Sequence, residues 1–178
     1  MRYLFGKIAT GSVVAIAFMG SAAYAQAPAA KGSVVVASPT YTSAEMEITV
    51  NRPIADVWKR IGKYCDVSEW LQAPAPCKMV SGKEGEPAAV RSPGGGEVLV
   101  GRTEYSYTYT QPPKEGVPYN LYHGTLEARP VNANTTKILY TLVWDNSMLA
   151  DDAARAADKD ARRARFTKAL QKIGRAHV

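Results

Sequence analysis

The alternation of apolar and polar residues is most regular between Val98 and Tyr109. One side of an extended chain there would carry Leu99 together with Tyr105, Tyr107 and Tyr109. A period of two, with tyrosine, threonine and valine so frequent, predicts a β-strand rather than a helix. Three phenol rings would then stand in one row. Such a row can pack as core and still offer hydroxyl groups to the polar end of a bound molecule.

Other segments with the same period predict further strands, and the turns between them predict antiparallel pairing. The expected strands are Thr42–Asn51, Cys77–Ser81, Ala88–Ser92, Leu121–Arg129 and Lys137–Asp145. Residues 132–134 (Asn-Ala-Asn) supply a hairpin turn before the last strand. If every strand keeps its period, the tyrosine row lies on the concave, apolar side of the sheet.

Helical spacing of apolar residues appears in three places. Residues 53–62 and 65–71 predict two short helices directly after the first strand. Residues 151–173 contain neither glycine nor proline and predict one long helix. Its large apolar side chains, Phe166, Leu170 and Ile173, lie roughly 140° around the axis from an alanine stripe. We therefore expect the C-terminal half of this helix to be the half that packs against the sheet.

The first 25 residues have the pattern of a secretory signal peptide. Arg2 and Lys7 precede an apolar run over residues 8–19, and Ala-Tyr-Ala at 23–25 is a small-x-small cleavage site. The run is shorter than the ~20 residues that a membrane span needs, which disfavours an anchor that stays attached. We expect cleavage near Ala25, a periplasmic or secreted mature protein, and no stable membrane span in it.

The rest of the chain predicts one domain with short flanking segments. Residues 26–40, rich in alanine and proline, read as a flexible lead-in, and residues 41–172 are long enough for a single domain. Residues 173–178 (IGRAHV) resemble the translation of a sequencing adapter, so we exclude them from function.

Charge and cysteine content narrow the range of functions. Without Arg2 and Lys7 the chain keeps 20 basic against 16 acidic residues, a net charge of +4 that is scattered along the sequence, so we expect no nucleic-acid partner. Cys65 and Cys77 are the only cysteines, and export predicts a disulfide between them, with two buried thiols as the alternative. With eleven residues between them and no nearby histidine, they lack the ligand number and spacing that zinc requires.

No motif in the sequence predicts catalysis. His123 falls on the polar face of its strand with Thr125 and Glu127, which favours an exposed histidine over a general base. GxSxG, HExxH and phosphate-loop motifs do not occur. We therefore expect no catalytic residue, no metal site and no cofactor.

The order of these elements resembles the START/pollen-allergen-like helix-grip superfamily, SRPBCC. The resemblance rests on RPIADVW (52–58), the AVR and glycine-rich turn (89–96), YHGTLEARPV (122–131), and the terminal Phe166 and Leu170. Within that superfamily, the chain is similar to the polyketide cyclase/dehydrase and lipid-transport subgroup. This implies an α+β fold in which a bent antiparallel sheet wraps around the long C-terminal helix, with a cavity between them for an apolar or amphipathic small molecule. It implies no shared catalytic residue.

The favoured hypothesis is an exported carrier or sensor for a lipid-like or aromatic molecule. An enzyme, a cyclase or hydrolase that uses the tyrosines as acids or oxyanion donors, is the first alternative. A periplasmic interaction module with a filled core is the second, and plain core packing is the alternative for each aromatic taken singly. The expected ligand-binding residues are Tyr105, Tyr107, Tyr109, Tyr122, Tyr140 and Trp144, closed by Trp58, Phe166 and Leu170.

Overall fold

The computed structural model describes residues 38–175. The expected signal peptide therefore lies outside the described residues, as do most of the lead-in and the last three positions. Among the described residues, no helix is both long and apolar enough to cross a membrane.

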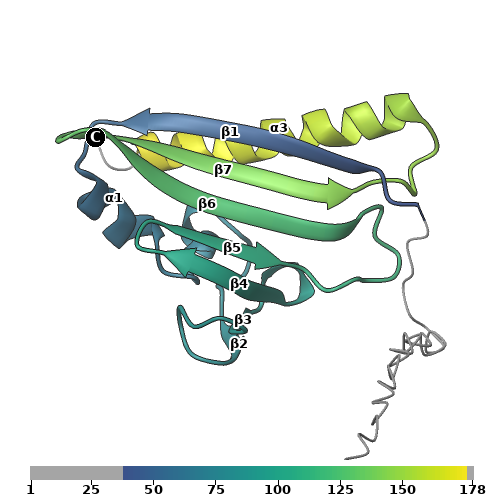
Figure 1. Cartoon of the computed structure of the whole chain (residues 1–178), viewed down its shortest axis with the longest axis horizontal. Coiled ribbons are helices and arrows are strands. Elements are labelled where there is room, and N and C mark those ends of the chain that lie inside the picture. The colour runs from purple at the N-terminus through teal and green to yellow at the C-terminus, as the bar shows by residue number, and fades with distance from the viewer. Residues whose placement is uncertain (1–37, 176–178) are drawn as a thin grey trace, which may run out of the picture. The chain divides into compact units, whose positions relative to one another are not determined.

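Seven antiparallel strands form one sheet in the order β1-β7-β6-β5-β4-β3-β2 (Figure 1). Two short helices follow the first strand and a long helix ends the chain, so the predicted α+β helix-grip fold is confirmed. The strands are β1 (Tyr41–Val50), β2 (Met79–Ser81), β3 (Val90–Arg91), β4 (Glu97–Thr103), β5 (Ser106–Thr110), β6 (Asn120–Asn132) and β7 (Thr135–Asp145). The helices are α1 (Ile54–Ile61), α2 (Val67–Trp70), the 3₁₀ turn η1 (Pro93–Gly95) and α3 (Asp152–Arg175).

The long strands bury one face and expose the other, as their alternation predicts. On β7 the side chains of Ile138, Tyr140, Leu142 and Trp144 are buried, whereas the residues between them are only half-buried. β1 and β6 pair with β7 on its two sides, so their apolar residues join the same core. His123 lies on the exposed face of β6, as expected.

The segment from Val98 to Tyr109 is a hairpin, and the prediction of one continuous strand there was wrong. The chain turns at Glu104 and Tyr105, and Thr103 pairs with Ser106. The hydroxyl groups of that closing pair lie 2.7 Å apart. A register irregularity after Leu99 lets this residue face Tyr109 across the two strands, so both side chains still enter the core. The predicted burial of the tyrosine face is confirmed for Tyr107 and Tyr109, whereas Tyr105 lies in the turn and is only half-buried.

Helix α3 is anchored by its C-terminal half, as the apolar pattern predicts. Phe166, Leu170 and Ile173 are buried, whereas Ala157, Ala161 and Ala164 of the alanine stripe are exposed. The helix runs alongside β1 (Figure 1). Burying a large apolar side chain stabilises a fold by about 1.5 to 3 kcal/mol, and an alanine buries far less surface. The two halves of the helix therefore differ in how strongly they hold the sheet.

A disulfide joins Cys65 to Cys77, as predicted, with their Cα atoms 5.3 Å apart. The bridge closes a loop that contains α2 and the segment from Leu71 to Pro76. Helix α2 packs against α3, and Val67 and Trp70 belong to the core. The loop is thus held at its base by the bridge and along its side by the terminal helix.

Candidate functional site

A cavity of about 520 Å³ lies between the sheet and α3. The loop after α2 forms its rim, β4, β5 and β6 form its floor, and α3 forms the remaining wall. Its lining residues are Leu71–Pro76, Ser92, Pro93, Glu97, Tyr109, Gln111, Tyr119, Tyr122, Arg162, Arg165 and Phe166.

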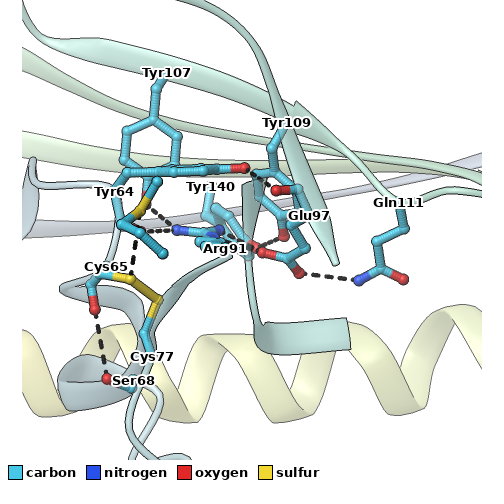
Figure 2. Close-up of polar contacts among 11 residues, drawn as sticks. Tyr64, Cys65, Ser68, Cys77, Arg91, Glu97, Tyr107, Tyr109, Gln111 and Tyr140 are labelled. Atoms are coloured by element: carbon cyan, nitrogen blue, oxygen red, sulfur yellow. Dashed lines mark hydrogen bonds and ion pairs between the residues drawn. A yellow bond between two sulfur atoms is a disulfide. The ribbon is translucent and has the colours of Figure 1, made fainter. Parts of the chain in front are cut away.

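A buried ion pair stands beside the inner end of this cavity. Arg91 is 0% exposed on β3, and its Nε donates to Glu97 Oε2 over 2.7 Å. Arg91 Nη2 lies 2.6 Å from the same oxygen, but off the direction of a hydrogen bond. Arg91 Nη1 donates to the backbone carbonyl of Tyr64. Figure 2 shows the guanidinium between Tyr64 and the carboxylate of Glu97.

Aromatic rings complete the surroundings of the Arg91 guanidinium. Its central carbon lies 4.0 Å from the ring centre of Tyr64 and 4.7 Å from that of Tyr109. Ring faces are electronegative, so they offset part of the cost of burying the cation. Burial lowers the pKa of Arg91, but the Tyr107 phenol and the Glu97 carboxylate outweigh it and raise that pKa, so the group stays charged.

A chain of hydrogen bonds leads from Glu97 to the cavity wall. Gln111 Nε2 donates to Glu97 Oε1 over 3.0 Å, and Tyr119 Oη donates to Gln111 Oε1 over 3.0 Å. Burial raises the pKa of Glu97, and the charge of Arg91 and the bond from Gln111 oppose that shift. The cavity therefore has a polar inner end whose groups are already held in place by protein partners (Figure 2).

One of the tyrosines that line the cavity, Tyr109, packs against a glycine on the next strand. Gly124 of β6 pairs with Tyr109 of β5, and a Cβ atom added at Gly124 would lie 2.5 Å from Tyr109 Oη. The missing side chain leaves room for the ring to lie across the strand. The Tyr109 hydroxyl hydrogen-bonds the hydroxyl of Tyr140, and the Tyr122 ring lies beside that of Tyr109 with centres 6.3 Å apart.

The wall from α3 is polar where it faces the sheet. Asp158 Oδ2 accepts from Trp144 Nε1 over 2.7 Å, and Asp158 Oδ1 accepts from Arg162 Nε over 3.0 Å. The Arg162 guanidinium lies 4.4 Å from the ring centre of Tyr119 and 5.8 Å from that of Tyr122. The Arg162 side chain is therefore fixed by one carboxylate and flanking aromatic rings.

The structure divides the predicted ligand-binding residues into two groups. Tyr109, Tyr122 and Phe166 line the cavity. The other six do not line it, because they pack into the core or at its margin: Trp58, Tyr105, Tyr107, Tyr140, Trp144 and Leu170. Tyr107, for example, stacks edge-on against Tyr64 and faces Arg91 instead of the cavity. Alternation identifies the face on which a side chain lies, but not whether the space in front of it is filled.

Several site residues were not predicted from the sequence. Glu97, Gln111, Arg162 and Arg165 line the cavity, and Arg91 supports it from behind. The sequence did contain a signal for the burial of Arg91. Arg91 lies two residues after Ala89 in an extended segment, so both side chains point to the same face, which is buried. The arginines of α3 resembled an ordinary solvated helix surface.

Across residues 38–175, no three acidic, histidine or cysteine side chains gather as a metal site would require. His123 is exposed, and its Nδ1 lies 2.9 Å from the backbone carbonyl of Leu121.

The bent sheet, the terminal helix and the cavity between them define a helix-grip protein. The chain belongs to the polyketide cyclase / dehydrase and lipid transport family, whose pattern matches residues 41–176. No curated protein matches the chain.

Solved structures share this fold at low sequence identity. A protein from Nitrosospira multiformis is 22% identical with a TM-score of 0.60, and the match covers 77% of this chain and 97% of that one. The di-domain ARO/CYC BexL from the BE-7585A biosynthetic pathway is 14% identical with a TM-score of 0.59, over 75% of this chain and 45% of that one. Ara h 8.0201 is 16% identical with a TM-score of 0.54, over 75% and 98%. These likenesses show the shared fold.

We predict that the buried ion pair is strongly coupled. Arg91→Met leaves the Glu97 carboxylate buried without its cation and should lower the free energy of unfolding by ~3 to 5 kcal/mol. Adding Glu97→Gln to that variant should recover part of the loss, because no charge is then buried. Urea denaturation of wild type, both single variants and the double variant measures the coupling. A double variant as unstable as the sum of the single effects would contradict it.

We also predict a loss of stability in alkaline solution. Burial raises the pKa values of the Tyr64, Tyr107, Tyr109, Tyr122 and Tyr140 phenols above the ~10 of a free phenol. The neutral rings thus contribute stability that is fully present below pH ~10 and is lost as the pH rises through the folded-state pKa values. Phenolate absorbance should therefore rise together with cooperative unfolding. Titration of most phenols near pH ~10 in a protein that stays folded would refute the burial argument.

Proposed function

We propose that this protein binds an amphipathic small molecule in the cavity between the sheet and α3, and that it acts as an exported carrier or sensor. The observation that carries the proposal is the cavity of about 520 Å³ with an aromatic wall and a polar inner end. Small-molecule sites commonly measure ~300 to 1,000 Å³ and combine apolar walls with a few placed polar groups. Membership in the polyketide cyclase / dehydrase and lipid transport family supports the same conclusion.

The distribution of groups around the cavity supports an amphipathic ligand over a purely apolar one. Tyr109, Tyr122 and Phe166 offer ring surface, whereas Glu97 and Gln111 offer polar atoms at the inner end. A hydrocarbon placed against Glu97 would remove water from a carboxylate without replacing the hydrogen bonds lost, which costs free energy. A ligand hydroxyl or amine at that position would replace them. The open volume disfavours an interaction module with a filled core.

An enzyme is the second candidate, and Glu97 is the observation that favours it. A buried carboxylate with a raised pKa beside a cavity is a common arrangement for a general acid or base. The same carboxylate is already engaged by Arg91 and Gln111, which favours a structural role. A molecule that co-purifies distinguishes the two candidates, because an enzyme converts it during incubation and a carrier releases it unchanged.

We predict saturable binding of one neutral fluorophore, N-phenylnaphthylamine, per protein. Ala73→Trp places a large side chain on the rim and should weaken binding at least about tenfold, since it occupies the entrance. Ala161→Trp is the matched control, because Ala161 lies on the exposed side of α3 and not on the cavity wall. Fluorescence titration gives affinity and stoichiometry, and circular dichroism checks the fold. Equal weakening by both substitutions, or no saturable binding by wild type, would defeat the proposal.

Export is the second part of the proposal, and the pattern of residues 1–25 together with the disulfide supports it. Disulfides persist in oxidising compartments such as the periplasm. We expect protein purified from its own cell envelope to begin at Gln26 and to gain the mass of two hydrogens on reduction. Intact-mass spectrometry measures both quantities. A chain that keeps residues 1–25, or free thiols at Cys65 and Cys77 in the untreated protein, would contradict this localisation.

A further inference from the structure

The charged side chains that line the cavity differ in how far a neighbouring opposite charge neutralises them. Glu97, Arg162 and Arg165 are the charged residues among its lining. Glu97 at the inner end is neutralised from behind by Arg91, whose Nη2 lies 2.6 Å from it. Positive charge is left on the α3 side of the cavity. The position of a charged ligand group is therefore set by Arg162 and Arg165.

The Arg162 side chain is held in place by protein contacts before any ligand binds. Its Nε bonds Asp158 and its guanidinium lies 4.4 Å from the Tyr119 ring centre and 5.0 Å from the Trp144 ring centre. Among the described residues, Arg162 donates a hydrogen bond only from Nε, so its two Nη groups are available as donors. An ordered side chain loses little conformational entropy when it binds an anion.

Arg165 adds a cation that has no carboxylate partner. It lies three residues after Arg162, so the two side chains leave the same side of the helix. Its guanidinium lies 5.4 Å from the ring centre of Phe166, and no carboxylate among residues 38–175 forms an ion pair with it. Asp158 balances only one of these two arginines. The mouth of the cavity therefore carries one uncompensated positive charge.

We propose that the ligand carries one anionic group, a carboxylate, sulfonate or phosphate, held at the mouth by Arg165 and Arg162, with its apolar part against the aromatic wall and an uncharged polar end beside Glu97. The inference rests on the proposed binding function. The Glu97 carboxylate disfavours an anion at the inner end, so the ligand enters with its uncharged end first. Hydrogen bonds between charged groups are about twice as strong as those between neutral groups. The site should therefore prefer an anionic ligand to a neutral one of the same shape.

Two fluorophores with the same rings test this inference. Anilinonaphthalene sulfonate differs from N-phenylnaphthylamine by its sulfonate, and we expect wild type to bind the sulfonate on the order of tenfold more tightly. Arg165→Gln should weaken binding of the sulfonate much more than binding of the neutral fluorophore, and should so remove most of that preference. Arg163→Gln makes the same change of charge two residues earlier on α3, outside the cavity lining, and should retain the preference.

The outcomes separate this inference from the proposal on which it depends. If wild type binds neither fluorophore, the binding function itself fails. If the two bind equally, or if Arg163→Gln acts like Arg165→Gln, the anionic inference is overturned while binding in the cavity stands. Competitors then identify the source of the anion: displacement by decanoate assigns a single-chain carboxylate, and displacement by lysophosphatidylglycerol assigns a lipid headgroup. Decanol competing as well as decanoate would also overturn it.

Discussion

The buried pair of Arg91 and Glu97 is the constraint on which the site depends. Two charges removed from water are stable only when their remaining donors and acceptors are met, so each partner fixes further groups. Arg91 requires the carbonyl and ring of Tyr64, and Glu97 requires the amide of Gln111. These residues come from β3, β4, the connection between α1 and α2, and the position directly after β5. One ion pair therefore holds in register the segments that surround the inner end of the cavity.

The cavity exists because α3 is made of two unlike halves. Its last turns insert Phe166, Leu170 and Ile173 into the core and close that end of the molecule. Its earlier turns present Asp158 and Arg162, which are too polar to enter an apolar core. Asp158 instead accepts a hydrogen bond from the Trp144 indole, and Arg162 lies over the rings of Tyr119 and Tyr122. Polar side chains hold the helix near the sheet without filling the space between them. A helix with leucines in those positions would fill the space that a ligand needs.

The sequence predicted the fold better than the site, and the reason is physical. β1, β6, β7 and α3 each have a buried face long enough to impose a period, so their type and their inner faces were correct. The hairpin at Glu104 and Tyr105 was missed, because neither residue is a typical turn former and the alternation continues through the turn. The buried charge of Arg91 was missed because an arginine can be placed on an inner face only when the acidic residue that pairs with it is known. Glu97 follows it closely in sequence, but only the pairing of β3 with β4 brings the two together.

The disulfide bounds the mouth of the cavity on one side. Cys65 and Cys77 are joined, and the segment between them contains the rim from Leu71 to Pro76. A bridge that closes so short a loop restricts how far its middle can move from its ends. The rim is further held by α2, which packs on α3. Since the rim is confined at its base and its side, the size and charge of the opening depend mainly on the side chains of α3 that face it, Arg162 and Arg165.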